Sequence, residues 1–237
     1  MVSVKSRLSM SSSRENAQTD HLVSLYSQKD DLYFASPQVK IIDLIDRVGL
    51  KVLDFGCGSG ETGKTLLATG KASWVTGIEL VPETGAIARG VLNDVRVGNI
   101  EEMDFGWTAN EFDCFLFGDV LEHLTNPWRL LRRLRSLLPK NGMLVASLPN
   151  VRHLPIMSSL FFHDQWQYTE SGVLDFSHLR FFTRKTAMQL FAETGYSVEL
   201  IQPAFNGRRY SIPNSITFGK LAGFLAIQWL IRAKNVG

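Results

Sequence analysis

Short apolar segments alternate with helical ones from residue 51 onward, and this alternation constrains the fold more than any other feature of the chain. Five continuous apolar runs bounded by turn residues are predicted to be buried strands: 51–55, 73–80, 94–97, 112–117 and 142–148. Helices are predicted between them at 60–68, 83–91 and 128–138. Strands that alternate with helices through short connections form a doubly wound parallel sheet, so the predicted fold class is α/β.

The last third of the chain continues this pattern. A helix is predicted over 183–194, because Thr183 can cap its start and Gly195 can end it. Strands are predicted at 196–202 and at about 224–233.

The composition is that of an ordinary globular domain, since 45% of the 237 residues are hydrophobic and 20% are charged. It excludes a disordered chain, a collagen and a disulfide scaffold. The formal net charge of +2 gives no reason to expect a nucleic-acid partner. Cys57 and Cys114, the only cysteines, lie in apolar or glycine-rich segments, which favours a reducing, cytoplasmic compartment.

Residues 1–30 lack a signal-peptide core, so we expect a flexible tail followed by one domain over 31–237. The longest apolar stretch, 216–231, is interrupted by Lys220 and Gln228 and is too short to span a bilayer. It is predicted to be core, with peripheral membrane contact as the alternative. No acidic residue follows Glu199, which indicates either a solvated basic surface or attraction to an anionic substrate or membrane.

Residues 150–182 interrupt the alternation and are too long for an ordinary connection in such a fold. The segment is rich in aromatic and histidine side chains, and it follows the carboxyl end of a strand, where open α/β sheets bind their ligands. We expect a lid over the substrate; the alternative is an insertion with a small core of its own. The predicted substrate-binding residues are Asn150, His153, Trp166, Tyr168 and Asp175.

The first strand runs into a glycine-rich loop ahead of a helix, Asp-Phe-Gly-Cys-Gly-Ser-Gly at 54–60. Glycines let the backbone approach a ligand closely, and the helix N-terminus offers free N–H groups. The overlapping segment 58–65 also matches the phosphate-binding pattern G-x-x-x-x-G-K-[ST], which taken alone predicts an ATP or GTP site.

Polar residues after the strands favour an adenosyl ligand without phosphates instead. Asp54 ends the first strand, where it can meet an ammonium group, and Glu79 ends the second, where it can accept from both ribose hydroxyls. Asn99 and Ile100 follow the third strand and can meet the adenine edge. A nucleoside-triphosphate site explains none of these positions.

Three segments carry a wider resemblance: Val-Leu-Asp-Phe-Gly-Cys-Gly-Ser-Gly at 52–60, Phe-Asp-Cys-Phe-Leu-Phe-Gly-Asp-Val-Leu-Glu-His-Leu at 112–124, and Leu-Pro-Lys-Asn-Gly-Met-Leu at 138–144. Over about 33–234 the chain resembles class I S-adenosylmethionine-dependent methyltransferases. The resemblance implies a Rossmann-like sheet of seven strands, the last antiparallel. It also implies S-adenosylmethionine as cofactor, bound by Asp54, Gly56, Gly58, Gly60, Glu79, Asn99, Ile100 and Asp119. Asn99 replaces the usual Asp, but its side-chain carbonyl can still accept from adenine.

A narrower resemblance lies in two segments at the ends of the predicted lid. They are Ser-Leu-Pro-Asn-Val-Arg-His at 147–153 and Gly-Val-Leu-Asp-Phe-Ser-His-Leu-Arg-Phe-Phe-Thr at 172–183. They resemble a bacterial subgroup whose members accompany glycosyltransferases and cell-surface polysaccharide genes. This implies a hydroxyl of a saccharide, glycolipid or related small metabolite as acceptor, although acceptors vary widely on one fold.

A hydroxyl acceptor needs a base or a metal ion, since it must lose its proton as the methyl group arrives. The predicted catalytic residues are His178, Asp119 and His123. In one mechanism His178 is the base, oriented by Asp119 or Asp175. In the other, Asp119, Glu122, His123 and His178 hold a divalent cation, which is possible but not expected. Their spacing is similar to that in metal-dependent small-RNA 2′-O-methyltransferases and ubiquinone-pathway O-methyltransferases. In a third interpretation Glu122 and His123 only brace the loop.

The predicted function is methylation of a small-molecule or glycan hydroxyl. The alternatives are methylation of an RNA or a quinone, a P-loop nucleotide-binding protein, and a non-catalytic adenosyl-binding module.

Overall fold

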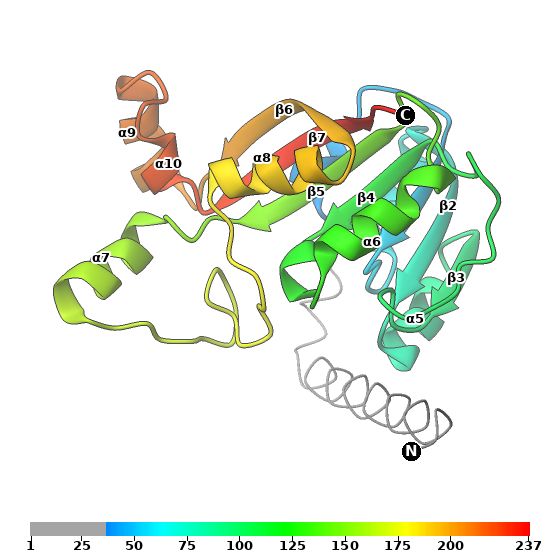
Figure 1. The fold of residues 1–237 in the computed structure, drawn as a ribbon, viewed down its shortest axis with the longest axis horizontal. Coiled ribbons are helices and arrows are strands. Elements are labelled where there is room, and N and C mark those ends of the chain that lie inside the picture. The colour runs from blue at the N-terminus through cyan, green and yellow to red at the C-terminus, as the bar shows by residue number, and fades with distance from the viewer. Residues whose placement is uncertain (1–36) are drawn as a thin grey trace, which may run out of the picture.

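Seven strands form a single sheet in the order β3-β2-β1-β4-β5-β7-β6 (Figure 1). The structure is a computed structural model that describes residues 37–237, so the tail predicted at 1–30 lies outside the described residues. The strands are β1 (Leu50–Phe55), β2 (Ala72–Glu79), β3 (Asp94–Val97), β4 (Cys114–Gly118), β5 (Met143–Pro149), β6 (Tyr196–Ala204) and β7 (Gln228–Asn235).

The pairing of the strands confirms the predicted seven-stranded, mostly parallel sheet. The strand β1 pairs in parallel with β2 and β4, and the parallel pairing continues to β3 on one side and β5 on the other. Only β7 runs against its neighbours, β5 and β6. All parallel strands therefore end at one edge of the sheet, where a ligand site is expected.

The last strand begins at Gln228, four residues later than predicted, because a short helix, α10 (Ala222–Leu225), precedes it. The side-chain amide of Asn150 donates to the carbonyl oxygens of Gly223 and Ala226 at 3.1 and 2.8 Å, which holds this helical turn in place. A short apolar run does not by itself distinguish a strand from a helix, so the contact with Asn150 decides the start of β7.

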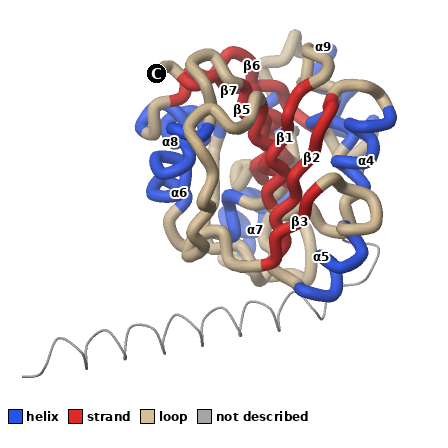
Figure 2. The backbone as a smooth tube through the Cα atoms, turned by 90° about the vertical axis from the view of Figure 1, so that its right-hand side faces the viewer, coloured by secondary structure: helices blue, strands red, loops and turns tan. Residues whose placement is uncertain are grey.

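Helices cover both faces of the sheet (Figure 2). One face carries α3 (Val39–Ile42), α4 (Glu61–Ala68) and α5 (Pro82–Ala88), and the other carries α6 (Pro127–Leu134) and α8 (Arg184–Glu193). The turn η2 (Arg135–Leu137) extends α6. Side chains of β4 alternate between the two cores: Phe115 and Phe117 pack on the face with α6 and α8, whereas Cys114 and Leu116 pack on the opposite face.

The insertion between β5 and α8 closes at its base, where Asn150 and Phe182 form an isolated bridge. It contains α7 (Leu154–His163), whose residues are all at least partly exposed, followed by an irregular loop. The helices α7, α9 (Arg208–Ile216) and α10 project beyond the sheet at the same end of the molecule (Figure 1). Within residues 37–237 no helix combines the length and apolar character needed to cross a bilayer.

Candidate functional site

A first cavity lies at the carboxyl ends of β1, β2, β3 and β4. The segments that follow these strands form its walls, together with residues of α4 and the side chain of Gln38. It is lined by Gln38, Gly56, Cys57, Gly58, Glu61, Thr62, Ile78, Glu79, Leu80, Gly98, Asn99, Ile100, Glu101, Gly118, Asp119, Val120, His123 and Leu124. Six of the eight predicted cofactor residues belong to this lining, and Asp54 and Gly60 do not.

The glycine loop requires glycine for two reasons. Gly56 and Gly60 have φ angles of +66° and +89°, a left-handed conformation that other residues rarely adopt. A Cβ on Gly56 would also lie 2.7 Å from a methyl group of Val120, and one on Gly60 would lie 2.6 Å from Val91. A side chain at either position would therefore force its neighbours to move.

Two buried acids lie next to this loop. Glu79 accepts hydrogen bonds from the backbone N–H groups of Gly58, Leu80 and Val81 at 2.9 to 3.0 Å, so its carboxylate fixes the loop to the end of β2. Asp54 is buried, and one of its carboxyl oxygens has no hydrogen-bond partner among the described residues. Burial, and after it the charge of Glu79, raises the pKa of Asp54 to about 8. A cationic group of a bound ligand would lower the pKa of Asp54 again, since it favours the charged carboxylate.

Lys64, the lysine of the phosphate-binding pattern, does not face the first cavity. Its ammonium group lies 3.1 Å from Glu61, and its side chain is 54% exposed. A phosphate-binding lysine must point into the loop, so this geometry gives no support to a nucleoside-triphosphate site.

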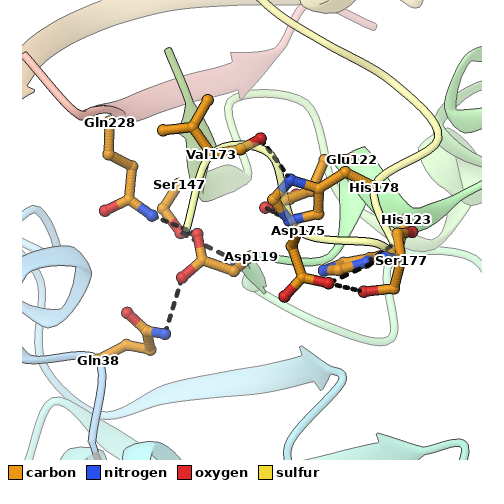
Figure 3. Close-up of polar contacts among 10 residues, drawn as sticks. All are labelled: Gln38, Asp119, Glu122, His123, Ser147, Val173, Asp175, Ser177, His178 and Gln228. Atoms are coloured by element: carbon orange, nitrogen blue, oxygen red, sulfur yellow. Dashed lines mark hydrogen bonds and ion pairs between the residues drawn. The ribbon is translucent and has the colours of Figure 1, made fainter. Parts of the chain in front are cut away.

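Asp119 follows β4 in a left-handed conformation, with φ of +56°, and is held by three polar side chains (Figure 3). Gln38 donates to one carboxyl oxygen at 3.1 Å, while Ser147 at 2.8 Å and Gln228 donate to the other. The backbone N–H of Asp119 also donates to Ser147 Oγ at 2.9 Å. Burial raises the pKa of Asp119, and these hydrogen bonds oppose the rise.

Sequence reasoning did not assign Gln38, Ser147 or Gln228 to the site. Two of them could have been found from the sequence, because Ser147 places a hydroxyl inside a buried apolar strand and Gln228 interrupts the apolar stretch 216–231. For Gln38 the sequence carries no such signal.

A second cavity adjoins the first at Asp119, which lines both. Its walls come from the ends of β4 and β5, from the insertion, and from the start of β7. The lining residues are Asp119, Glu122, Pro149, Gly172, Val173, Asp175, His178, Ile227 and Gln228.

The insertion is attached to the turn η1 (Leu121–His123), which begins two residues after Asp119. The backbone N–H groups of Leu179 and Arg180 donate to the carbonyl oxygen of Glu122 at 2.8 and 2.9 Å. His123 Nδ1 lies 3.1 Å from the carbonyl oxygen of Ser177. These bonds bring residues of the insertion, more than 50 positions away in sequence, against η1.

His178 and Glu122 face each other beside the second cavity (Figure 3). His178 Nδ1 lies 2.9 Å from the carbonyl oxygen of Val173, which can only accept, so Nδ1 carries the ring proton. In the neutral ring the lone pair is then on Nε2, which is 4.0 Å from Glu122 Oε1. Glu122 thus lies within ion-pair distance of His178, although the sequence favoured Asp119 or Asp175 for orienting this ring.

Glu122 is the most unusual side chain in the site. It is completely buried, and neither carboxyl oxygen has a hydrogen-bond partner among the described residues. Burial, followed by the charges of Asp119 and Asp175, raises its pKa well above the usual range. Buried carboxyl groups are normally hydrogen-bonded, so an unsatisfied one beside a cavity indicates a role with a ligand or a proton.

Glu122, His123 and His178 are also placed to hold a metal ion, since their ligand atoms lie within 4.8 Å of one another. Asp119, the fourth ligand in the metal hypothesis, does not belong to this group. Its carboxyl oxygens accept from Gln38, Ser147 and Gln228 instead.

The predicted substrate-binding residues occupy different places. Asn150 is fully buried and bonds the turn at α10, and His153 is buried against the ring of Tyr210 at a centroid distance of 4.9 Å. Asp175 lines the second cavity and accepts from the backbone N–H and the hydroxyl of Ser177 at 2.9 and 2.6 Å.

The predicted substrate-binding residues Trp166 and Tyr168 lie in the irregular loop of the insertion. Trp166 contacts Phe181 at a centroid distance of 5.4 Å, and Tyr168 stacks on Phe176 at 6.1 Å. None of these rings lines either cavity in this arrangement of the chain.

Sequence comparison places the chain among known methyl-transfer proteins. A family described as "Methyltransferase domain" matches residues 28–201. A ubiquinone biosynthesis O-methyltransferase of Xanthomonas axonopodis pv. citri (strain 306) is 34% identical over 112 residues, which are 45% of this chain and 46% of that protein. The chain thus matches about half the length of the curated relatives it resembles.

Solved structures share the fold at low sequence identity. An S-adenosylmethionine dependent methyltransferase from Mesorhizobium loti has a TM-score of 0.60 and 16% identity, covering 83% of this chain and 96% of that one. A possible histamine N-methyltransferase from Thermotoga maritima has a TM-score of 0.58 and 17% identity, covering 83% and 87%. At this identity the likeness shows the fold alone, and the fold does not decide the acceptor.

Proposed function

The chain belongs to the family of S-adenosylmethionine-dependent methyltransferase domains, and we propose that it transfers the methyl group to a hydroxyl oxygen of a small molecule bound in the second cavity. Asp119 lines both cavities, so a cofactor in the first and an acceptor in the second would meet beside it. The observation that carries the proposal is the buried pair of Glu122 and His178 at this junction.

The residues around the first cavity fit S-adenosylmethionine. Asp54 offers a buried carboxyl oxygen that lacks a partner among the described residues, and Gly56 and Gly58 line the cavity without side chains. Glu79 keeps acceptor capacity for ribose hydroxyls, because three backbone donors do not exhaust the lone pairs of a carboxylate. When bound, the cofactor would supply an electrophilic methyl group, whose bond to sulfur breaks as the group is transferred, leaving S-adenosylhomocysteine.

The protein's part in the reaction is to align the acceptor oxygen and to take its proton. As the acceptor oxygen bonds to the methyl carbon, its O–H bond breaks and the proton passes to His178 Nε2. Val173 holds the ring in the tautomer that this transfer requires, since it accepts from Nδ1. The imidazolium that forms lies 4.0 Å from Glu122, and its positive charge favours the carboxylate form of that acid.

A divalent cation held by Glu122, His123 and His178 is the second mechanism that the geometry supports. Such an ion would lower the pKa of the acceptor hydroxyl, so that no protein base is needed. The same three side chains would then be ligands.

For the acceptor we propose a hydroxyl of a saccharide or glycolipid, which rests on the motifs at 147–153 and 172–183. A phenolic hydroxyl is the second candidate, because the relatives from Xanthomonas are named ubiquinone biosynthesis O-methyltransferases. A screen of both acceptor classes with labelled cofactor distinguishes them.

Single-residue variants and a chelator test the mechanism with the acceptor found in that screen. If His178 is the base, His178→Ala should lower kcat by about 10²–10⁴, Glu122→Gln should lower it less, and EDTA should have no effect. His163→Ala, which removes an exposed histidine of α7, is the matched control and should keep full activity.

Under the metal mechanism, EDTA abolishes turnover, an added divalent ion restores it, and His123→Ala fails as badly as His178→Ala. A His178→Ala variant that keeps nearly full kcat would contradict both mechanisms and the hydroxyl acceptor with them.

A further inference from the structure

The segment between β6 and β7 leaves several large apolar side chains in water. No residue of α9 is fully buried. Ile212, Ile216 and Phe218 are 52%, 71% and 93% exposed, and Leu221 and Phe224 are also exposed. Soluble proteins seldom gather apolar side chains in this way unless the surface binds something.

The same segment is basic. Arg208, Arg209 and Lys220 are exposed, and the guanidinium of Arg152 lies over the ring of Phe224 at 4.2 Å. No acidic residue follows Glu199 in the sequence, whereas the whole chain has a net charge of only +2. The positive charge is therefore a local property of the surface that carries the exposed apolar residues.

We propose that α9, α10 and the turn between them, residues 207–225, form a docking surface for a bilayer that contains anionic lipids. Apolar side chains flanked by cations suit an interface where acyl chains lie beneath negatively charged headgroups. A nucleic acid or an acidic protein surface would use the cations but would leave Ile216 and Phe218 in water. No helix within 37–237 can cross a membrane, so the segment rests on the bilayer rather than spanning it.

The docking surface adjoins the second cavity. Ile227 and Gln228, which are separated from α10 only by Ala226, line that cavity. An acceptor attached to a lipid could then reach the cavity from the membrane surface. This consequence rests on the proposed function, but docking itself does not, and it is measured below without turnover.

Co-sedimentation of the full chain with vesicles tests the docking. The chain should bind vesicles of phosphatidylcholine mixed with phosphatidylglycerol, should not bind pure phosphatidylcholine, and should dissociate as salt is raised. Arg208→Glu/Arg209→Glu/Lys220→Glu should weaken binding by more than about tenfold, since each basic residue contributes about fivefold. Ile216→Ser/Phe218→Ser should weaken it several-fold by removing apolar contact alone.

The control Arg129→Glu/Arg132→Glu/Lys140→Glu makes the same change in charge at exposed positions in α6 and shortly after it, and should bind like the unmodified chain. An unchanged affinity for S-adenosylhomocysteine shows that each variant is folded. The proposal is overturned if the chain ignores anionic vesicles, or if the first charge-reversed variant binds as well as the control. It is also overturned if Ile216→Ser/Phe218→Ser separates a dimer and leaves vesicle binding intact, because the surface would then join two copies of the chain.

Discussion

At the scale of single residues, Asp54 links the structure most directly to ligand binding. Its pKa is about 8, so the carboxyl group is mostly protonated at pH 7 before any ligand binds. An ammonium group nearby favours the carboxylate. We therefore expect the binding of S-adenosylhomocysteine at pH 7 to release close to one proton. Titration calorimetry in buffers of different ionisation enthalpy measures this number, and Asp54→Asn should bring it near zero.

The stability of the ligand-free chain provides an independent check on Asp54. Between pH 3.8, the usual pKa of this group, and about 8, the folded chain holds a proton that the unfolded chain has lost. The free energy of unfolding should therefore decrease as the pH rises through this range, and the decrease should be smaller in Asp54→Asn. An equal slope in both proteins, together with no proton release on binding, would mean that Asp54 is ionised in the free protein.

At the scale of elements, the insertion is tied to η1 at one end, whereas its aromatic residues contact one another further along the loop. We expect this loop to close over the acceptor. Trp166→Ala or Tyr168→Ala should then raise the KM for the acceptor and leave the affinity for S-adenosylhomocysteine nearly unchanged. Steady-state kinetics and calorimetry separate the two effects, and Ile87→Ala on α5, which is also an exposed apolar residue, is the control. Equal losses for both ligands would instead assign the aromatic residues to the stability of the insertion.

At the scale of the whole molecule, thermal stability shows which ligand binds in the first cavity, because a bound ligand stabilises the folded state. A ligand at one hundred times its Kd stabilises the folded state by about 2.7 kcal/mol, which raises the Tm of a domain of this size by about 5–10 °C. S-adenosylhomocysteine should produce such a shift and Mg-ATP should not. Lys64→Ala should keep the shift, because Lys64 pairs with Glu61 at the surface. Glu79→Ala should reduce it, because three backbone N–H groups lose their acceptor.

A stabilisation by Mg-ATP that disappears in Lys64→Ala would instead support the phosphate-binding pattern at 58–65. Thermal unfolding of the two variants with each ligand covers all four combinations.

The sequence alone determined the sheet, the helices α4, α5, α6 and α8, and most of the first cavity. Strands and helices follow from local periodicity, and the carboxyl ends of parallel strands necessarily meet at one edge. Gly56, Gly58 and Glu79 could therefore be placed from their positions relative to the predicted strands. The start of β7 was one exception, because an apolar run of that length suits a helix as well. The helices α7 and α9 were not predicted either.

Only the tertiary structure decided which side chains meet at the junction of the two cavities. Asp119 is held by Gln38, Ser147 and Gln228, which are 81, 28 and 109 positions away in the sequence. Glu122 lies beside His178 because the insertion folds back onto η1. Such pairs leave no periodic signal, because they depend on how separate elements pack rather than on the spacing of residues within one element.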